Sequence, residues 1–174
     1  ISNNSSLLGV GCAGYQPNED TTGWCLGGDH KGGLSERAFI NVTGMAYDGV
    51  GSLLVSSLDQ PGIKKFNVST GAYEGTYARQ DRSPTRWVAD FNSIVEDEGY
   101  GDHSMYAPSG VHVEGDFIFV SESESSRVKK FNKYTGELLG WVGGMTSKPT
   151  TGEQPDICDT ANGMGPSPAW CLDA

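Results

Sequence analysis

One pattern occurs twice in this sequence, and the repeat constrains the fold more than any other feature. The first copy is Gly44-Met45-Ala46-Tyr47-Asp48, then Gly51–Ser56, then Ile63-Lys64-Lys65-Phe66-Asn67 and Thr70-Gly71. The second copy is Gly110-Val111-His112-Val113-Glu114, then Gly115–Ser121, then Val128-Lys129-Lys130-Phe131-Asn132 and Thr135-Gly136. We expect two copies of one supersecondary unit.

Each copy predicts a run of antiparallel strands. Met45–Tyr47 and Val111–Val113 are short inner strands that end at Gly-containing hairpin turns. Leu53–Ser56 and Phe117–Ser121 are apolar runs of strand length, suited to burial on both faces. The Lys-containing strands follow, and Gly-ended turns lead to an outer strand such as Leu138–Val142. Three or four such strands in about 40 residues describe one blade of a β-propeller.

These residues give the sequence a resemblance to the NHL-repeat family of β-propellers. The second copy matches the family pattern closely, with Ala107-Pro108-Ser109-Gly110-Val111 and Arg127-Val128-Lys129-Lys130-Phe131. The first copy lacks the Pro before Gly44 and has Pro61-Gly62 in place of the Arg. The resemblance implies an all-β fold of about two complete NHL-type blades plus partial strands. It implies no single activity, because such propellers include lyases, hydrolases, protein-binding modules and structural proteins.

We expect one propeller segment over residues 1–174. Its parts are an outer strand with a first Cys loop (1–38), a blade (39–78), an insertion (79–104), a blade (105–143) and a second Cys loop (144–174). Propellers close with about four to eight blades, so two blades leave open strand edges. Copies of this chain, or neighbouring repeats, are therefore expected to pair through blade edges in a ring or a filament.

The four cysteines fall into two pairs with the same spacing. Twelve residues separate Cys12 from Cys25 and Cys158 from Cys171, and Trp24-Cys25-Leu26 recurs as Trp170-Cys171-Leu172. This pattern favours two copies of one disulfide-closed loop. A zinc site is the alternative, but no pair has the short ligand spacing and the three His are scattered. The offset of 146 positions between the pairs is typical of a piece cut from a longer array.

Glycosylation signals favour an extracellular or cell-surface protein. Asn3, Asn4, Asn41 and Asn67 each begin an N-x-S/T sequon. The sequence starts at Ile1 with neither an initiator Met nor an apolar signal segment, as a mature secreted product or a fragment would. Covalently attached glycans are therefore expected.

The insertion at 79–104 carries a helical pattern. Ser83 and Pro84 form a helix start, and the apolar residues that follow have helical spacing: Trp87, Val88, Phe91, Ile94 and Val95. The helix would pack over the propeller face or dock a neighbouring subunit. Met145–Gly152 is predicted to be a polar loop, and Gly163–Pro168 is predicted to lack regular structure.

Charge and composition exclude some partners and leave one ion open. The formal charge of −10 argues against nucleic-acid binding, and no run of about 18 apolar residues predicts membrane insertion. The acidic cluster Glu96–His103 could hold Ca²⁺, although a charge run is more often a solvated face. No other cofactor is expected.

The sequence shows no catalytic motif of the common kinds. His30, His103 and His112 lie in different segments, and Ala46 occupies the place of His112 in the first copy. A structural role for His112 is therefore expected rather than a metal ligand in a channel. Asp48 and Glu114 fit turn-forming roles, and Ser121–Ser126 is predicted to be an exposed turn.

Repetition without a focused polar site favours a non-enzymatic extracellular structural module built of NHL-like blades. It would be part of a longer array or a subunit of a cell-surface filament. One alternative is a section of a propeller enzyme, a metal-assisted lyase or hydrolase. The other is a module that binds glycans or proteins through a face bearing Trp87 and Tyr100.

Overall fold

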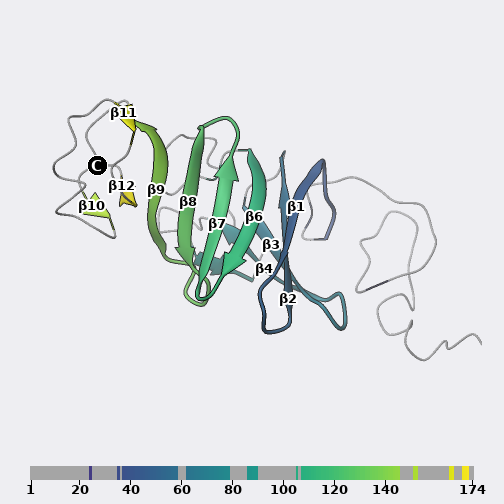
Figure 1. The fold of residues 1–174 in the computed structure, drawn as a ribbon. Coiled ribbons are helices and arrows are strands. Elements are labelled where there is room, and N and C mark those ends of the chain that lie inside the picture. Colours follow the sequence, from purple (N-terminus) through teal and green to yellow (C-terminus); the bar gives the residue numbers. More distant parts are fainter. Residues whose placement is uncertain are drawn as a thin grey trace, which may run out of the picture.

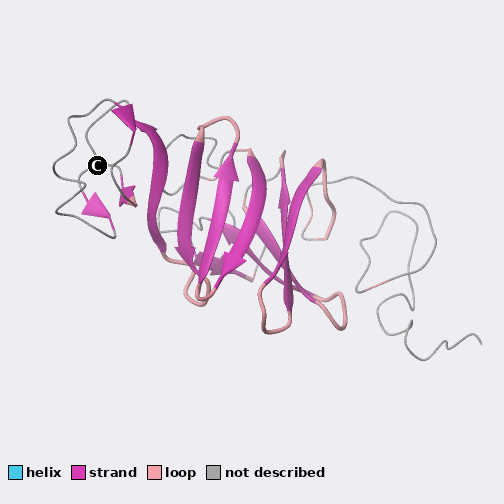
Figure 2. Ribbon diagram, in the orientation of Figure 1, coloured by secondary structure: helices cyan, strands magenta, loops and turns pink. Residues whose placement is uncertain are grey.

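The computed structural model describes residues 24, 35, 37–58, 62–78, 86–89, 105, 107–145, 151–152, 165–166 and 170–172. These residues form two antiparallel sheets and no helix, as Figures 1 and 2 show. The predicted all-β class is therefore confirmed for the described part of the chain.

The first sheet has five strands in sequence order. They are β1 (Val42–Tyr47), β2 (Ser52–Ser57), β3 (Ile63–Asn67), β4 (Tyr73–Ala78) and β5 (Arg86–Val88). The apolar run predicted for β2 and the Lys-containing strand predicted for β3 are both present, with Leu54 and Lys64 fully buried. Asp48 and the glycines after it form the turn between β1 and β2.

The second sheet repeats this order and adds short strands at its far edge. It contains β6 (Pro108–Glu114), β7 (Phe117–Glu122), β8 (Arg127–Asn132), β9 (Leu138–Met145), β10 (Thr151–Gly152), β11 (Gly165–Pro166) and β12 (Cys171–Leu172). Two predictions for this region are wrong. Met145 ends a strand rather than starting a loop, and Gly165–Pro166 pairs with β9 rather than lacking regular structure.

The helix predicted from Ser83 onward is wrong at Trp87 and Val88. These residues belong to β5, which pairs with β4 by placing Trp87 opposite Tyr77. Aromatic and β-branched residues favour strands, and the open edge of β4 offers backbone partners that an isolated helical turn would lack. Trp87 also packs edge-on against Tyr77, with ring centroids 5.4 Å apart. The rest of the predicted helix lies outside the described residues.

The two sheets share their irregularities as well as their strands. Each inner pair has a register shift near its start, between Val42 and Gly44 and between Pro108 and Gly110. Each third strand has a shift after its second Lys. In each turn that follows, an Asn side chain accepts two backbone N–H bonds, Asn67 in the first sheet and Asn132 in the second. The sequence repeat is therefore a structural repeat, offset by 66 positions in the inner strands and by 65 positions from the second strand on.

The correspondence extends to the fifth strand. Trp87 lies opposite Tyr77 on β4, and Cys171 lies opposite Trp141 on β9, which places Trp170 and Cys171 where Trp87 and Val88 stand in the first sheet. A glycine with positive φ faces the fifth strand in both sheets, Gly75 at 147° and Gly140 at 149°. A Cβ at Gly140 would lie 2.4 Å from the carbonyl carbon of Trp170, so the close approach requires glycine.

The sheets pack face to face around one apolar core. From the first sheet come Leu54, Ile63 and Tyr77, and from the second sheet Ile118, Val120, Phe131 and Leu138, with Met105 beside them. β1 and β2 contact β6, and β1 lies next to β6 in Figure 1. Here Gly44 approaches Gly110 so closely that a Cβ on Gly44 would lie 3.1 Å from the Gly110 Cα.

Hydrogen bonds also join the two sheets. Thr43 donates its hydroxyl proton to the Pro108 carbonyl over 2.8 Å. Lys133 reaches back from the second sheet and donates to the carbonyls of Asp48 at 3.0 Å and Gly115 at 2.8 Å. The Tyr77 hydroxyl donates to the Gly136 carbonyl. One face of the first sheet is thus matched to one face of the second.

Candidate functional site: the outer face of the first sheet

The first sheet has a second face, turned away from the core, and this face is apolar. We call it the outer face of the first sheet; its residues are Val42, Met45, Tyr47, Leu53, Val55 and Phe66. Met45 and Tyr47 are 66% and 56% exposed. The corresponding residues on β6, Val111 and Val113, are partly buried against the core. The same strand positions are therefore covered in the second sheet and bare in the first.

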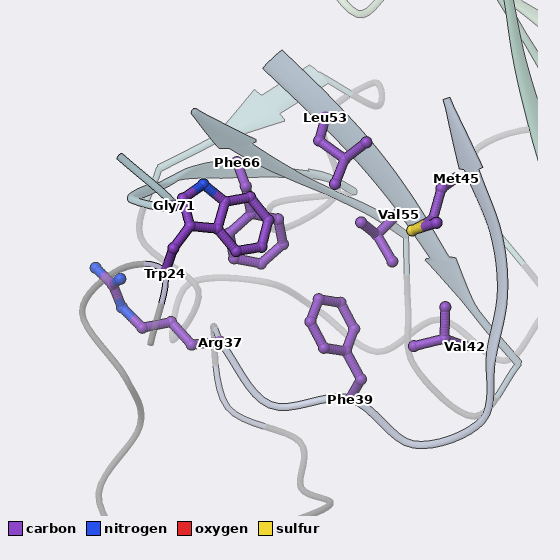
Figure 3. Close-up of a pocket in the computed structure, with 9 residues that line it drawn as sticks. All are labelled: Trp24, Arg37, Phe39, Val42, Met45, Leu53, Val55, Phe66 and Gly71. Carbon is purple, nitrogen blue, oxygen red and sulfur yellow. The ribbon is translucent and has the colours of Figure 1, made fainter. Parts of the chain in front are cut away.

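A hollow of about 220 Å³ lies on this face. Figure 3 shows the side chains that surround it, which come from β1, β2, β3 and the segment before β1. They are Trp24, Arg37, Phe39, Val42, Met45, Leu53, Val55, Phe66 and Gly71. Phe39 and Phe66 contact each other with ring centroids 5.5 Å apart. Among the described residues, the walls of the hollow are therefore almost entirely apolar, with Arg37 as the one charged side chain.

Trp24 marks one end of the hollow and makes an informative hydrogen bond. Its indole Nε1 donates to the carbonyl of Val68 over 2.7 Å. In the interface between the sheets, Trp87 donates in the same way to the carbonyl of Lys133, over 3.0 Å. Val68 and Lys133 are equivalent turn residues, 65 positions apart. Trp24 therefore occupies, on the first sheet, the place that Trp87 occupies on the second.

Lys64 lies on the same face of the sheet and is fully buried next to Phe39, which lines the hollow. Its ammonium donates to the carbonyls of Ser35 and Ala38, both at 2.5 Å, and lies 5.0 Å from the centre of the Phe39 ring. A buried cation needs acceptors, and backbone carbonyls supply them here. The segment before β1 is thereby fixed against the sheet.

The equivalent lysine of the second sheet, Lys129, forms an ion pair with Glu122. Its Nζ lies 3.2 Å from Glu122 Oε1, and Arg127 lies 3.3 Å from Glu122 Oε2. All three side chains are buried. The prediction that Ser121–Ser126 is simply an exposed turn is therefore wrong for Glu122. The signal available in the sequence was Arg127 and Lys129, which lie two residues apart on one face of the next strand.

Asp48 forms the turn between β1 and β2, as predicted. One of its carboxylate oxygens accepts the backbone N–H groups of Val50, Gly51 and Ser52 at 2.8–2.9 Å. Burial alone would raise the pKa of Asp48, but the N–H donors of Ser52, Val50 and Gly51, together with Lys65, lower it below its ordinary value. Glu114, at the equivalent place, is exposed and lies 3.8 Å from His112. The predicted turn-forming role therefore fits Asp48 better than Glu114.

This difference predicts a pH dependence. Because the pKa of Asp48 is lowered by folding, its stabilising effect is present above its unfolded pKa of about 3.9 and is lost as the pH falls through the folded value. We expect Asp48→Asn to reduce the free energy of unfolding by about 1–2 kcal/mol at pH 7. The difference from the parent should shrink below pH 4 in urea titrations. Glu114→Gln is the matched control, and an equal loss there would contradict the assignment.

The predicted modification sites fall partly inside the described residues. Asn41 is exposed and has a positive φ of 53°. The Asn67 side chain caps its turn and donates to Glu74 Oε1 over 3.2 Å, a role that accounts for an Asn at this position without a glycan. Asn3 and Asn4 lie outside the described residues. Glycans at all four sites stay a prediction.

Cys171 is buried on β12 and is disulfide-bonded. Cys12, Cys25 and Cys158 lie outside the described residues, so the predicted pairing stays a prediction. Trp24 and Trp170, which precede Cys25 and Cys171, have different neighbours: Trp24 donates to the Val68 carbonyl, and Trp170 lies against Phe119 and Lys130.

The remaining predicted sites do not converge on a polar centre in the described part of the chain. His112 is exposed, and no group of three His, Cys, Asp or Glu side chains suited to a metal ion occurs among the described residues. Tyr100 and the acidic cluster Glu96–His103 lie outside them. Trp87 is half-buried between the sheets, so it does not form the exposed aromatic face of the alternative hypothesis. The described residues contain no helix long and apolar enough to cross a membrane.

Comparison with known proteins adds no relative. No family model matches this sequence, and no curated protein matches it. The function is therefore inferred from the chain's own residues.

Proposed function

We propose that this chain is a non-enzymatic extracellular structural module, built of NHL-like propeller blades, in a longer array or a cell-surface filament. The observation that carries the proposal is the exposed β1 part of the outer face of the first sheet, where Val42, Met45 and Tyr47 are 51%, 66% and 56% exposed. The second sheet has the same strands, shifts and turns, and its corresponding face is covered by the first sheet. The first sheet can therefore receive another sheet in the same way as the second sheet receives the first, so the unit can be repeated.

The two sheets also resemble neighbouring propeller blades in their arrangement. Their inner strands β1 and β6 lie side by side, and successive four-stranded meanders pack face to face. A closed ring would need more sheets than the two described here, in a longer chain or from other copies.

Electron microscopy of the purified protein tests the proposal. We expect rings or fibres with a repeat that matches pairs of sheets. Mass spectrometry before and after enzymatic glycan removal should detect glycans on the sequon asparagines. Separate single particles at every concentration, together with an unmodified mass, would contradict it.

A further inference from the structure

We infer that the outer face of the first sheet binds the outer face of the second sheet of another copy of this chain, head to tail. This inference rests on the proposed structural function and names the partner surface. We define the outer face of the second sheet by His112, Phe119, Lys130 and Trp170, which point away from the shared core. Contacts between copies would thus use sheet faces, whereas the sequence predicted contacts through strand edges.

The internal interface supplies the template for this contact. Within one copy, Leu54, Ile63 and Lys65 of the first sheet lie on the face turned toward the second sheet. Their equivalents 65 positions later are Phe119, Val128 and Lys130, on the outer face of the second sheet. The receiving residues are Val111, Val120 and Phe131, and their equivalents are Met45, Val55 and Phe66. Both halves of the internal interface therefore recur on the two outer faces.

The fifth-strand tryptophans extend the match. Trp87 lies beside Lys65, whose Nζ is 5.3 Å from the indole, and it donates to the Lys133 carbonyl of the facing sheet. Trp170 lies beside Lys130, the equivalent of Lys65, at 5.6 Å. The carbonyl equivalent to that of Lys133 is the carbonyl of Val68, on the first sheet. A second copy docked on this template would bring Trp170 to Val68.

Trp24 holds that position within a single copy. Its indole donates to the Val68 carbonyl, its backbone N–H donates to the Thr70 carbonyl over 3.2 Å, and its side chain is 51% exposed. Trp24-Cys25-Leu26 and Trp170-Cys171-Leu172 have the same residues. In the docked pair, Trp170 of the second copy takes the place of Trp24. The contact is heterologous, so each added copy presents one free face, and the assembly grows until it closes into a ring or continues as a filament.

Sedimentation velocity of the full chain across a concentration series tests the inference. The parent should form species larger than a dimer, either one closed ring or a growing series. Met45→Asp on the first sheet and Phe119→Asp on the second should each weaken association at least about tenfold, as loss of a central apolar contact does. Val50→Asp is the matched control, because Val50 is 70% exposed in the β1–β2 turn, and it should associate like the parent. Circular dichroism and a thermal melt establish that each variant is folded.

Mixing the two variants gives the sharpest result. The Met45→Asp copy keeps an intact second-sheet face, and the Phe119→Asp copy keeps an intact first-sheet face. A head-to-tail contact therefore predicts one-to-one heterodimers that do not grow further. A mixture that stays monomeric, or homodimers of the Phe119→Asp variant, would overturn the inference.

Two tryptophan variants test whether a second copy or the chain's own N-terminal segment occupies the outer face of the first sheet. Trp170→Ala should weaken association at least about tenfold, and Trp24→Ala should leave it as strong as in the parent or stronger. The opposite order would overturn the inference in favour of the N-terminal segment. If Met45→Asp still assembles, the inference that this face binds a second copy is wrong, whereas the proposed structural function is not contradicted. A parent protein that is monomeric both in sedimentation and under the electron microscope would contradict both the docking inference and the proposed structural function.

Discussion

Replacing Glu122 with alanine is expected to lower the free energy of unfolding by about 3–5 kcal/mol, because it leaves buried cations without their carboxylate. Lys129 and Arg127 both lie within 3.3 Å of Glu122, and all three side chains are buried. The Ser125 hydroxyl also donates to Glu122 over 2.7 Å. Urea unfolding followed by circular dichroism measures the loss.

Two variants make this result specific to the charge pair. Glu124→Ala removes an exposed carboxylate from the same turn and should change stability by less than about 0.5 kcal/mol. The double replacement Glu122→Leu with Lys129→Met removes both the acid and its nearest cation, and it should recover a large part of the loss. If Glu122→Ala is as stable as the parent, the buried pairing described here is wrong.

Replacing Phe131 with alanine is expected to cost about 3–5 kcal/mol, since it removes a buried ring from the centre of the shared core. Phe131 is 1% exposed, and its ring centroid lies 4.5 Å from that of Tyr77 in the facing sheet. The variant should weaken the first sheet together with the second. Urea unfolding should therefore show one transition, at lower urea, by both tryptophan fluorescence and circular dichroism.

Tyr134→Ala is the matched control for Phe131→Ala. Tyr134 lies three residues further on, is 61% exposed, and makes an exposed hydrogen bond to Asp116. Its loss should move stability by less than about 0.5 kcal/mol. Two separate transitions in Phe131→Ala would contradict a core shared between the sheets.

The strands were predictable because the sequence states them twice. Ile63–Asn67 is the observed β3, and Val128–Asn132 is β8 without its first residue. The predicted inner strands Met45–Tyr47 and Val111–Val113 are the later parts of longer strands, because the starts of β1 and β6 contain irregular pairing that alternation does not reveal. The turn role of Asp48 followed from its place before two glycines.

The fifth strand and the buried charges were not predictable in the same way. Trp87 and Val88 fit a helical spacing, and only the free edge of β4 makes them a strand. Glu122 lies in a run of Ser and Glu that is typical of a solvent-exposed turn. Its burial depends on the cations of the neighbouring strand. The outer face of the first sheet could not be found from sequence, because Met45 and Val111 look alike until one is seen covered and the other bare.

Two equivalent buried lysines, Lys64 and Lys129, are held by different parts of the chain. Lys129 lies 3.2 Å from Glu122, so a carboxylate on the neighbouring strand β7 is one of its partners. Lys64 donates to the backbone carbonyls of residues 35 and 38, which take the place of water around its buried ammonium. Burial of Lys64 in the first sheet therefore depends on acceptors that precede β1 in the chain, and the protein must retain Ser35 and Ala38 for this lysine to stay buried.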